Sequence, residues 1–131
     1  MLAAAILSAT FTTASAGIQI HTSCAAEVAS DPAHVRTLSS ELTRALAGVK
    51  APGGYALDVS LVRVDVTTTD GDVEIKVEAR AFVSDGKRRV RFSSTTTATA
   101  RGRVRDRELV HRDALTSIAD QLASLIRTHA R

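Results

Sequence analysis

Two Asp-Gly pairs, Asp70-Gly71 and Asp85-Gly86, are the feature that most constrains the fold of this chain. Each pair separates two stretches in which apolar and polar residues alternate, which is the pattern of a half-buried strand. Asp-Gly favours the type I′ turn because both residues tolerate positive φ, and that turn joins antiparallel strands through two residues. The sequence therefore predicts three consecutive antiparallel strands, over residues 55–67, 73–83 and 88–100.

Two-residue turns would also fix which residues face each other. In the first hairpin the expected cross-strand pairs are Val62–Ala79, Arg63–Glu78, Val64–Val77, Asp65–Lys76 and Val66–Ile75. These five pairs place apolar residues on one face and opposite charges on the other, which is favourable. The apolar residues change face between Leu61 and Val62, and this change predicts a bulge or bend in the first long strand.

In the second hairpin the expected apolar-face pairs are Ala81–Val90, Ala79–Phe92 and Val77–Ser94. On the polar face Arg80 would lie opposite Arg91, and Phe82 opposite Arg89. Like charges that face each other destabilise a sheet, so some interaction should offset them. Either the guanidinium groups extend into solvent and stack on Phe82, or they form an anion or partner site with Phe82 as its apolar floor.

Two helices are predicted beside these strands, over residues 32–47 and 107–129. Asp31 is a good N-cap and Pro32 suits the first helical position, while Asp106 can cap the second helix. The apolar residues at helical spacing are Val35, Leu38, Leu42 and Leu46 in the first helix, and Leu115, Ile118, Leu122, Leu125 and Ile126 in the second. With a short strand at residues 18–21, the order is strand, helix, three strands, helix. This order predicts an α+β fold whose antiparallel sheet has both helices packed on one face.

The N-terminal residues suggest export. The first charged residue is Glu27, and an apolar stretch ends in Ala14-Ser15-Ala16, whose small residues suit signal peptidase cleavage before Gly17. We therefore predict a signal peptide over residues 1–16, a single domain over residues 17–131, and a periplasmic or secreted protein. No Lys or Arg precedes the apolar part, so a buried N-terminal helix or a membrane anchor are the alternatives. The apolar run is short for a membrane span of about 20 residues.

The reactive residue types do not form a recognisable catalytic or metal site. Cys24 is the single cysteine, so an internal disulfide is excluded, while a free, modified or intermolecularly paired thiol stays open. The four histidines, His21, His34, His111 and His129, fall on separate predicted elements. His21 and Cys24 would supply only half of the four ligands of a structural zinc site. We expect no cofactor, no metal and no enzymatic activity.

Basic residues suggest where the chain makes contact. The formal net charge is only +3, which by itself does not indicate a nucleic-acid ligand. Arginines that lead into the second helix could bind phosphates with the help of the positive end of the helix dipole. The candidate partner or anion contacts are Arg80, Phe82, Arg89, Arg91, Arg101, Arg103, Arg105 and Arg107.

The order of elements resembles two families. Helix, three antiparallel strands and helix resembles the double-stranded-RNA-binding domain, whose basic residues at the start of the last helix would correspond to Arg105 and Arg107. Once the strand at residues 18–21 is included, the order is similar to small envelope accessory proteins of the lipopolysaccharide-assembly lipoprotein (LptE-like) type. That resemblance implies helices on one face of a sheet and a scaffolding or chaperoning role.

The leading hypothesis is therefore an exported, non-enzymatic binding or assembly module of the cell envelope. It would meet a protein partner through its open sheet face or a strand edge, and the sequence leaves its oligomeric state open. The alternative is a basic module that binds nucleic acid or another anionic polymer. A nucleic-acid partner conflicts with the predicted export.

Overall fold

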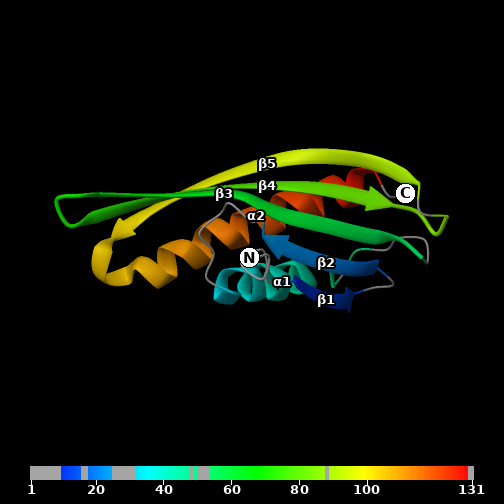
Figure 1. Cartoon of the computed structure of the whole chain (residues 1–131), viewed down its shortest axis with the longest axis horizontal. Helices are drawn as coiled ribbons and strands as arrows, with labels where there is room; N and C mark the ends of the chain where they lie inside the picture. The colour runs from blue at the N-terminus through cyan, green and yellow to red at the C-terminus, as the bar shows by residue number, and fades with distance from the viewer. Residues whose placement is uncertain are drawn as a thin grey trace, which may run out of the picture.

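The computed structural model describes residues 10–15, 18–24, 32–47, 49, 54–87 and 89–129. Within them lie a mixed sheet and two helices, and Figure 1 shows both helices on one side of the sheet. The elements are β1 (Thr10–Ser15), β2 (Ile18–Cys24), α1 (Pro32–Leu46), β3 (Ala56–Thr69), β4 (Asp72–Ser84), β5 (Val90–Arg103), a 3-10 turn η2 (Val104–Asp106) and α2 (Arg107–His129). The predicted α+β class, with its helices on one face, is confirmed.

The sheet departs from the prediction in the N-terminal half of the chain. Its strands lie in the order β1-β2-β3-β4-β5, and all neighbours are antiparallel except β2 and β3. The expectation of a wholly antiparallel sheet is wrong at this one pair. The chain leaves β2, passes through α1 and re-enters the sheet in the same direction, as a crossover connection allows.

Strand β1 was not expected. Its residues lie inside the predicted signal peptide, and they pair with β2 from Thr10 opposite Ser23 to Ser15 opposite Ile18. Cleavage before Gly17 would remove this strand from the sheet. The cleavage itself stays a prediction.

The first hairpin confirms the predicted turn and most of the predicted register. Asp70 has φ 49° and Gly71 has φ 83°, the two positive values that a type I′ turn requires. Val64 lies opposite Val77 and Asp65 opposite Lys76. The register then shifts between Leu61 and Arg63, which confirms the predicted bulge. Beyond that shift Ala79 faces Leu61 instead of the expected Val62.

The second hairpin has a longer loop and a different register. Ala79 lies opposite Thr96 rather than Phe92, a shift of four residues. The Asp85 carboxylate accepts hydrogen bonds from the backbone N–H groups of Lys87 (2.8 Å) and Arg89 (3.0 Å), which closes a loop over residues 85–89. Because the shift is even, most β5 side chains stay on the expected face. Val90 is the exception: it was expected inside and is 59% exposed.

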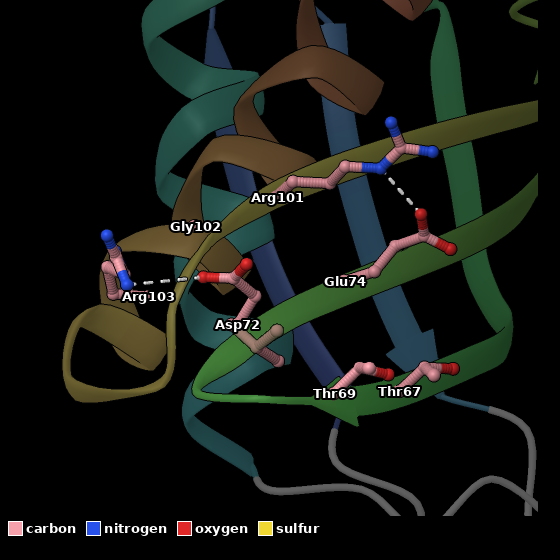
Figure 2. Close-up of a pocket in the computed structure, with 8 residues that line it drawn as sticks. Thr67, Thr69, Asp72, Glu74, Arg101, Gly102 and Arg103 are labelled. Atoms are coloured by element: carbon pink, nitrogen blue, oxygen red, sulfur yellow. Dashed lines mark hydrogen bonds and ion pairs between the residues drawn. The ribbon is translucent and has the colours of Figure 1, made fainter.

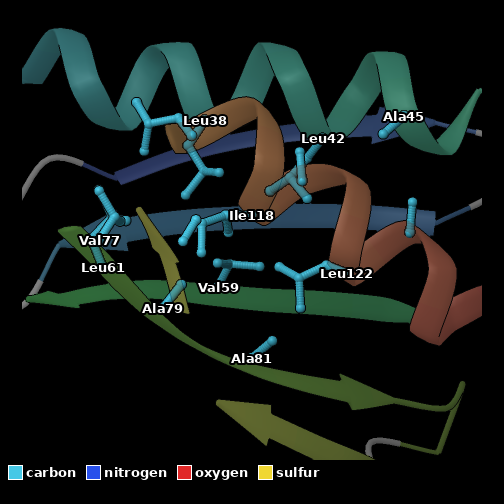
Figure 3. Packing of buried hydrophobic residues seen from close by; sticks show 14 of the residues in the cluster. Leu38, Leu42, Ala45, Val59, Leu61, Val77, Ala79, Ala81, Ile118 and Leu122 are labelled. Carbon is cyan, nitrogen blue, oxygen red and sulfur yellow. The ribbon is translucent and has the colours of Figure 1, made fainter. Parts of the chain in front are cut away.

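The core lies between the sheet and the two helices. Figure 3 shows Leu38 and Leu42 of α1 and Ile118 and Leu122 of α2 among the β3 and β4 side chains. Helices α1 and α2 run parallel, because contacts between them advance together along both chains, from His34–His111 to Arg44–Asp120. Both predicted helices are confirmed, α2 with the predicted bounds and α1 ending at Leu46 rather than residue 47.

Gly102 allows α2 to approach β5 closely. A Cβ atom added at Gly102 would lie 2.7 Å from Cγ2 of Val110, nearer than such atoms normally approach. Val110 is buried in the first turn of α2. The absence of a side chain at residue 102 therefore helps to set where the helix begins to cover the sheet.

Candidate interaction surface

The sheet face opposite the helices, called the outer face here, is polar. Every second residue of β2 to β5 points to it, as the alternating burial of β2 and β4 shows. Its charged residues are Asp58, Asp65, Asp72, Glu74 and Glu78, with Arg63, Lys76, Arg80, Arg101 and Arg103. Acidic and basic groups are therefore mixed across this face, and hydroxyl side chains of β3 and β5 lie between them.

At the β3–β4 turn, two of the predicted arginines already contact carboxylates of the neighbouring strand. The Arg101 Nε atom lies 2.6 Å from Glu74 Oε2, and Arg103 Nη1 lies 3.7 Å from Asp72 Oδ1. These pairs and the adjacent Thr67 line a shallow hollow of about 480 Å³ in the twisted sheet (Figure 2). Exposed ion pairs of this kind contribute little to stability. They do reduce the positive charge available to an anionic ligand.

The remaining arginines of this group leave the sheet. Arg105 lies in η2 with its Nε atom 3.8 Å from Asp106 Oδ2, and Arg107 begins α2. Both residues are exposed. The predicted basic helix start therefore exists, but an adjacent carboxylate accompanies one of its arginines.

The opposite end of the outer face carries Phe82 and Arg80. Phe82 is 40% exposed, and its cross-strand neighbours are Asp58 on β3 and Ser93 on β5. Arg80 lies between Ser60 and Thr95. An exposed aromatic ring beside a guanidinium group thus lies within a row of small polar side chains.

The predicted pairing of Arg80 with Arg91 and of Phe82 with Arg89 is wrong. The longer loop displaces both partners: β5 omits Arg91 from its pairing with β4 at a register shift. Arg89 lies in the loop, with its Nε atom 3.6 Å from Asp85 Oδ2. The like-charge contact that suggested an anion site is therefore absent from the described sheet. The role of these residues as partner contacts stays a prediction.

Hydrogen bonding within the β4–β5 loop changes the acidity of Asp85. The backbone N–H of Arg89 donates to its carboxylate, and the N–H of Lys87 does so too, which holds the pKa of Asp85 below its ordinary value. The nearby Arg89 and Arg91 guanidinium groups act in the same direction. The hydrogen bonds of this carboxylate therefore stabilise the β4–β5 loop.

A second polar cluster joins the helices. Glu41 accepts hydrogen bonds from Arg44 Nε (3.1 Å) and Thr116 Oγ1 (3.0 Å), and Arg44 also donates to Asp120 (3.1 Å). The hydrogen bonds to the two carboxylates raise the pKa of Arg44, with the larger effect from Asp120 and the smaller from Glu41. The cluster ties α1 to α2 and was missed from the sequence.

The structure also stacks two histidines that fall on separate predicted elements. The rings of His34 and His111 have centroids 4.1 Å apart and planes inclined by 20°. A signal was present, because each residue lies four positions before a leucine of its helix's apolar stripe and so faces the neighbouring helix.

The architecture defines an α+β domain in which two parallel helices cover one face of a five-stranded mixed sheet. No family model and no curated protein matches the chain. Solved structures do share the fold. A minor lipoprotein from Acinetobacter baumannii aligns over 86% of this chain and 92% of its own, with TM-score 0.57 and 11% identity. The PelC dodecamer from Paraburkholderia phytofirmans aligns over 95% of this chain and 99% of its own, with TM-score 0.55 and 19% identity.

These identities are low, so the similarity extends to the fold alone. Among the described residues, neither helix is both long and apolar enough to cross a lipid bilayer.

Proposed function

We propose that this chain is an exported, non-enzymatic accessory module of the cell envelope that binds a protein partner through its outer face. The observation that carries the proposal is Phe82, a large ring that is 40% exposed on a mostly polar outer face and is accompanied by Arg80. Aromatic side chains and arginine supply much of the binding energy at protein interfaces. The small residues around them would let a partner approach the ring closely.

The envelope location rests on two further considerations. The Ala14-Ser15-Ala16 segment has the residues that signal peptidase accepts. Among proteins with the same fold, one is named a minor lipoprotein. Both agree with the resemblance to accessory proteins of the lipopolysaccharide-assembly lipoprotein type, and neither identifies the partner.

The alternative, a binder of nucleic acid or another polyanion, has less support. Binding to a polyanion requires several uncompensated cations along one surface. Here Arg101, Arg103 and Arg105 each lie beside a carboxylate, and the outer face mixes both signs. A phosphate would have to compete with these carboxylates for the guanidinium groups.

Site-specific photo-crosslinking in the producing cell tests the proposal. A photoreactive phenylalanine analogue placed at residue 82 should give a discrete protein adduct. The same analogue at Lys76, exposed on the same face but distant from Phe82 along β4, should give much less. Equal adducts from both positions, or none from residue 82, would remove Phe82 as the contact.

The polyanion alternative has a separate test. Purified protein should bind heparin or double-stranded RNA weakly, if at all, at physiological salt. Tight binding that falls steeply as salt rises would support the alternative instead, because each displaced counterion contributes to that slope.

A further inference from the structure

Strand β5 forms one edge of the sheet, and its backbone shows which groups point outward. Val104 N donates to Gly71 O at 2.9 Å, so this antiparallel pair is of the hydrogen-bonded kind. Hydrogen-bonded and non-hydrogen-bonded pairs alternate along antiparallel strands. The even-numbered residues of β5 therefore bond to β4, and the odd-numbered residues turn their N–H and C=O groups away from it. Thr97 confirms this phase, because its carbonyl accepts from Gln121 Nε2 at 3.2 Å.

This edge lacks most of the features that normally prevent strand pairing. Exposed edges usually carry charges, proline, bulges or very short strands. Residues 92–100, with the sequence FSSTTTATA, contain no charge and no proline. They pair with β4 without a register shift. Gln121 of α2 reaches this edge and caps the carbonyl of Thr97.

We propose that a second copy of this chain docks on β5 by antiparallel pairing of the two β5 strands, with Thr95 on the two-fold axis. A strand paired with its own copy places odd residues opposite odd residues. The hydroxyl-rich outer faces of the two copies would then form one continuous surface, and all helices would lie on the other side of the joined sheet. Pairs between hydroxyl side chains are favourable across strands. The proposal uses β5 alone, so it depends neither on the fate of β1 nor on the partner proposed for Phe82.

Within β5, this register places no two charged residues opposite each other. Arg101 would come level with Arg89 of the second copy, which lies in the loop beyond the strand and is paired with Asp85. With Thr95 on the axis, Ser93 faces Thr97 of the second copy and Arg91 faces its Thr99. On the inner face the partly exposed Phe92 would lie opposite Ala98. An axis at Thr97 would instead place Arg91 opposite Arg103 of the second copy, and facing like charges disfavour pairing.

Gln121 has a defined role in this arrangement. In the single copy its amide satisfies the Thr97 carbonyl. In the dimer that carbonyl would accept the Ser93 N–H of the second copy, so Gln121 must release it. The side chain therefore competes with association and keeps the edge satisfied when the chain is alone.

Sedimentation velocity of the purified chain at increasing concentration tests the proposal. The wild type should shift from the mass of one 13.8 kDa chain towards twice that mass. Thr95→Lys places two lysines opposite each other, and its self-association should weaken roughly tenfold or more. Mixing Thr95→Lys with Thr95→Glu should restore a mixed dimer, because opposite charges then face each other across the axis.

Two further variants separate pairing from general damage. Thr97→Lys adds the same charge to the same face but would meet Ser93 of the second copy, so its association should stay near that of the wild type. Gln121→Ala removes the competing cap from both copies and should tighten association by roughly tenfold, because each released cap is one ordinary hydrogen bond. Thermal unfolding of each single chain checks the fold, since Arg80 lies opposite Thr95.

A wild type that stays a single chain at every concentration would overturn the proposal. So would a Thr97→Lys variant that dissociates while Thr95→Lys does not, because the axis would then lie elsewhere.

Discussion

Gly71 shows how one residue determines the course of the longest hairpin. Its φ of 83° lies in the left-handed region, where a side chain is disfavoured, and Asp70 before it has φ 49°. A Cβ atom added at Gly71 would meet no neighbour within 4 Å. The glycine is therefore required by the backbone conformation alone.

Gly71→Ala should lower the free energy of unfolding by about 1 kcal/mol, because alanine disfavours positive φ. Gly71→Asn is the matched control and should lose less, since asparagine tolerates that conformation. Urea unfolding of the two variants measures the difference. Equal losses would indicate that the cost arises from something other than φ.

The same dipeptide at residues 85–86 illustrates what a local pattern leaves undetermined. Asp-Gly correctly predicted a turn there, but the Asp85 carboxylate binds two loop N–H groups and stabilises a longer loop. Positive φ is found at Gly54 and Gly71 among the described glycines, and not at Gly86. The register of the hairpin depends on these hydrogen bonds of the Asp85 side chain. The expected contact of Arg80 with Arg91 depended in turn on the register.

At the scale of elements, the β4–β5 loop should respond to acid. Its hydrogen bonds hold the pKa of Asp85 below the ordinary value, so the charged carboxylate stabilises the folded state. This stabilisation is fully present above the ordinary carboxyl range, near pH 4, and is lost as the pH falls through the lower folded pKa.

Asp85→Asn should remove that part of the acid dependence. Amide hydrogen exchange of the loop between pH 5 and pH 2 follows it in both proteins. The wild-type loop should open progressively more than the rest of β4 as the pH falls. If the wild type and Asp85→Asn show the same pH dependence, the Asp85 carboxylate does not stabilise this loop.

The polar cluster between α1 and α2 permits a comparison of two ion-pair partners of Arg44. The Glu41 side chain is 11% exposed, whereas the Asp120 side chain is 59% exposed. Arg44→Ala should lower the free energy of unfolding by about 1 kcal/mol, because the sheltered Glu41 charge would then keep only the hydrogen bond from the Thr116 hydroxyl among the contacts described above.

Asp120→Ala is the control and should change stability by less than about 0.5 kcal/mol, as exposed pairs usually do. Thermal unfolding of both variants distinguishes them. A larger loss from Asp120→Ala would mean that the exposed bond between the helices contributes more to stability than the sheltered bond within α1.

Elements with strong periodicity were predicted well from the sequence. Pro32 and the leucine stripes located both helices, and the alternation of Val73, Ile75 and Val77 located β4. The contact between His34 and His111 was not predicted, because a stripe gives the buried side of a helix and does not reveal its neighbour. The alternation of β4 was enough to predict that Phe82 is exposed. Its neighbours on β5 could not be predicted, because they depend on the register of the second hairpin.

For the whole molecule, the main sequence prediction still to be measured is processing at the N-terminus. Mass spectrometry of the protein from the envelope or culture medium should give a chain that begins at Gly17. Such a chain would lack β1, and β2 would then form the second edge of the sheet. A mature chain that retains residues 10–15 would contradict the predicted cleavage.

The arrangement of the complete sheet could be predicted only in part. The three consecutive strands have short connections, and short connections force antiparallel neighbours. Strand β2 is followed by a helix, which can return the chain in either direction, so its parallel place beside β3 was not determined. Strand β1 was missed because its residues, TFTTAS, lie in a segment that also has the composition of an export signal.

The parallel contact of β2 with β3 has a kinetic consequence. The β3–β4 and β4–β5 pairs are local in sequence, whereas Ile20 reaches Leu57 only after α1 and its connections have been placed. Contacts between distant residues form slowly because the intervening chain must first lose its freedom. Refolding should therefore protect the amides of the C-terminal strands before those of β2, which would join an already assembled meander last.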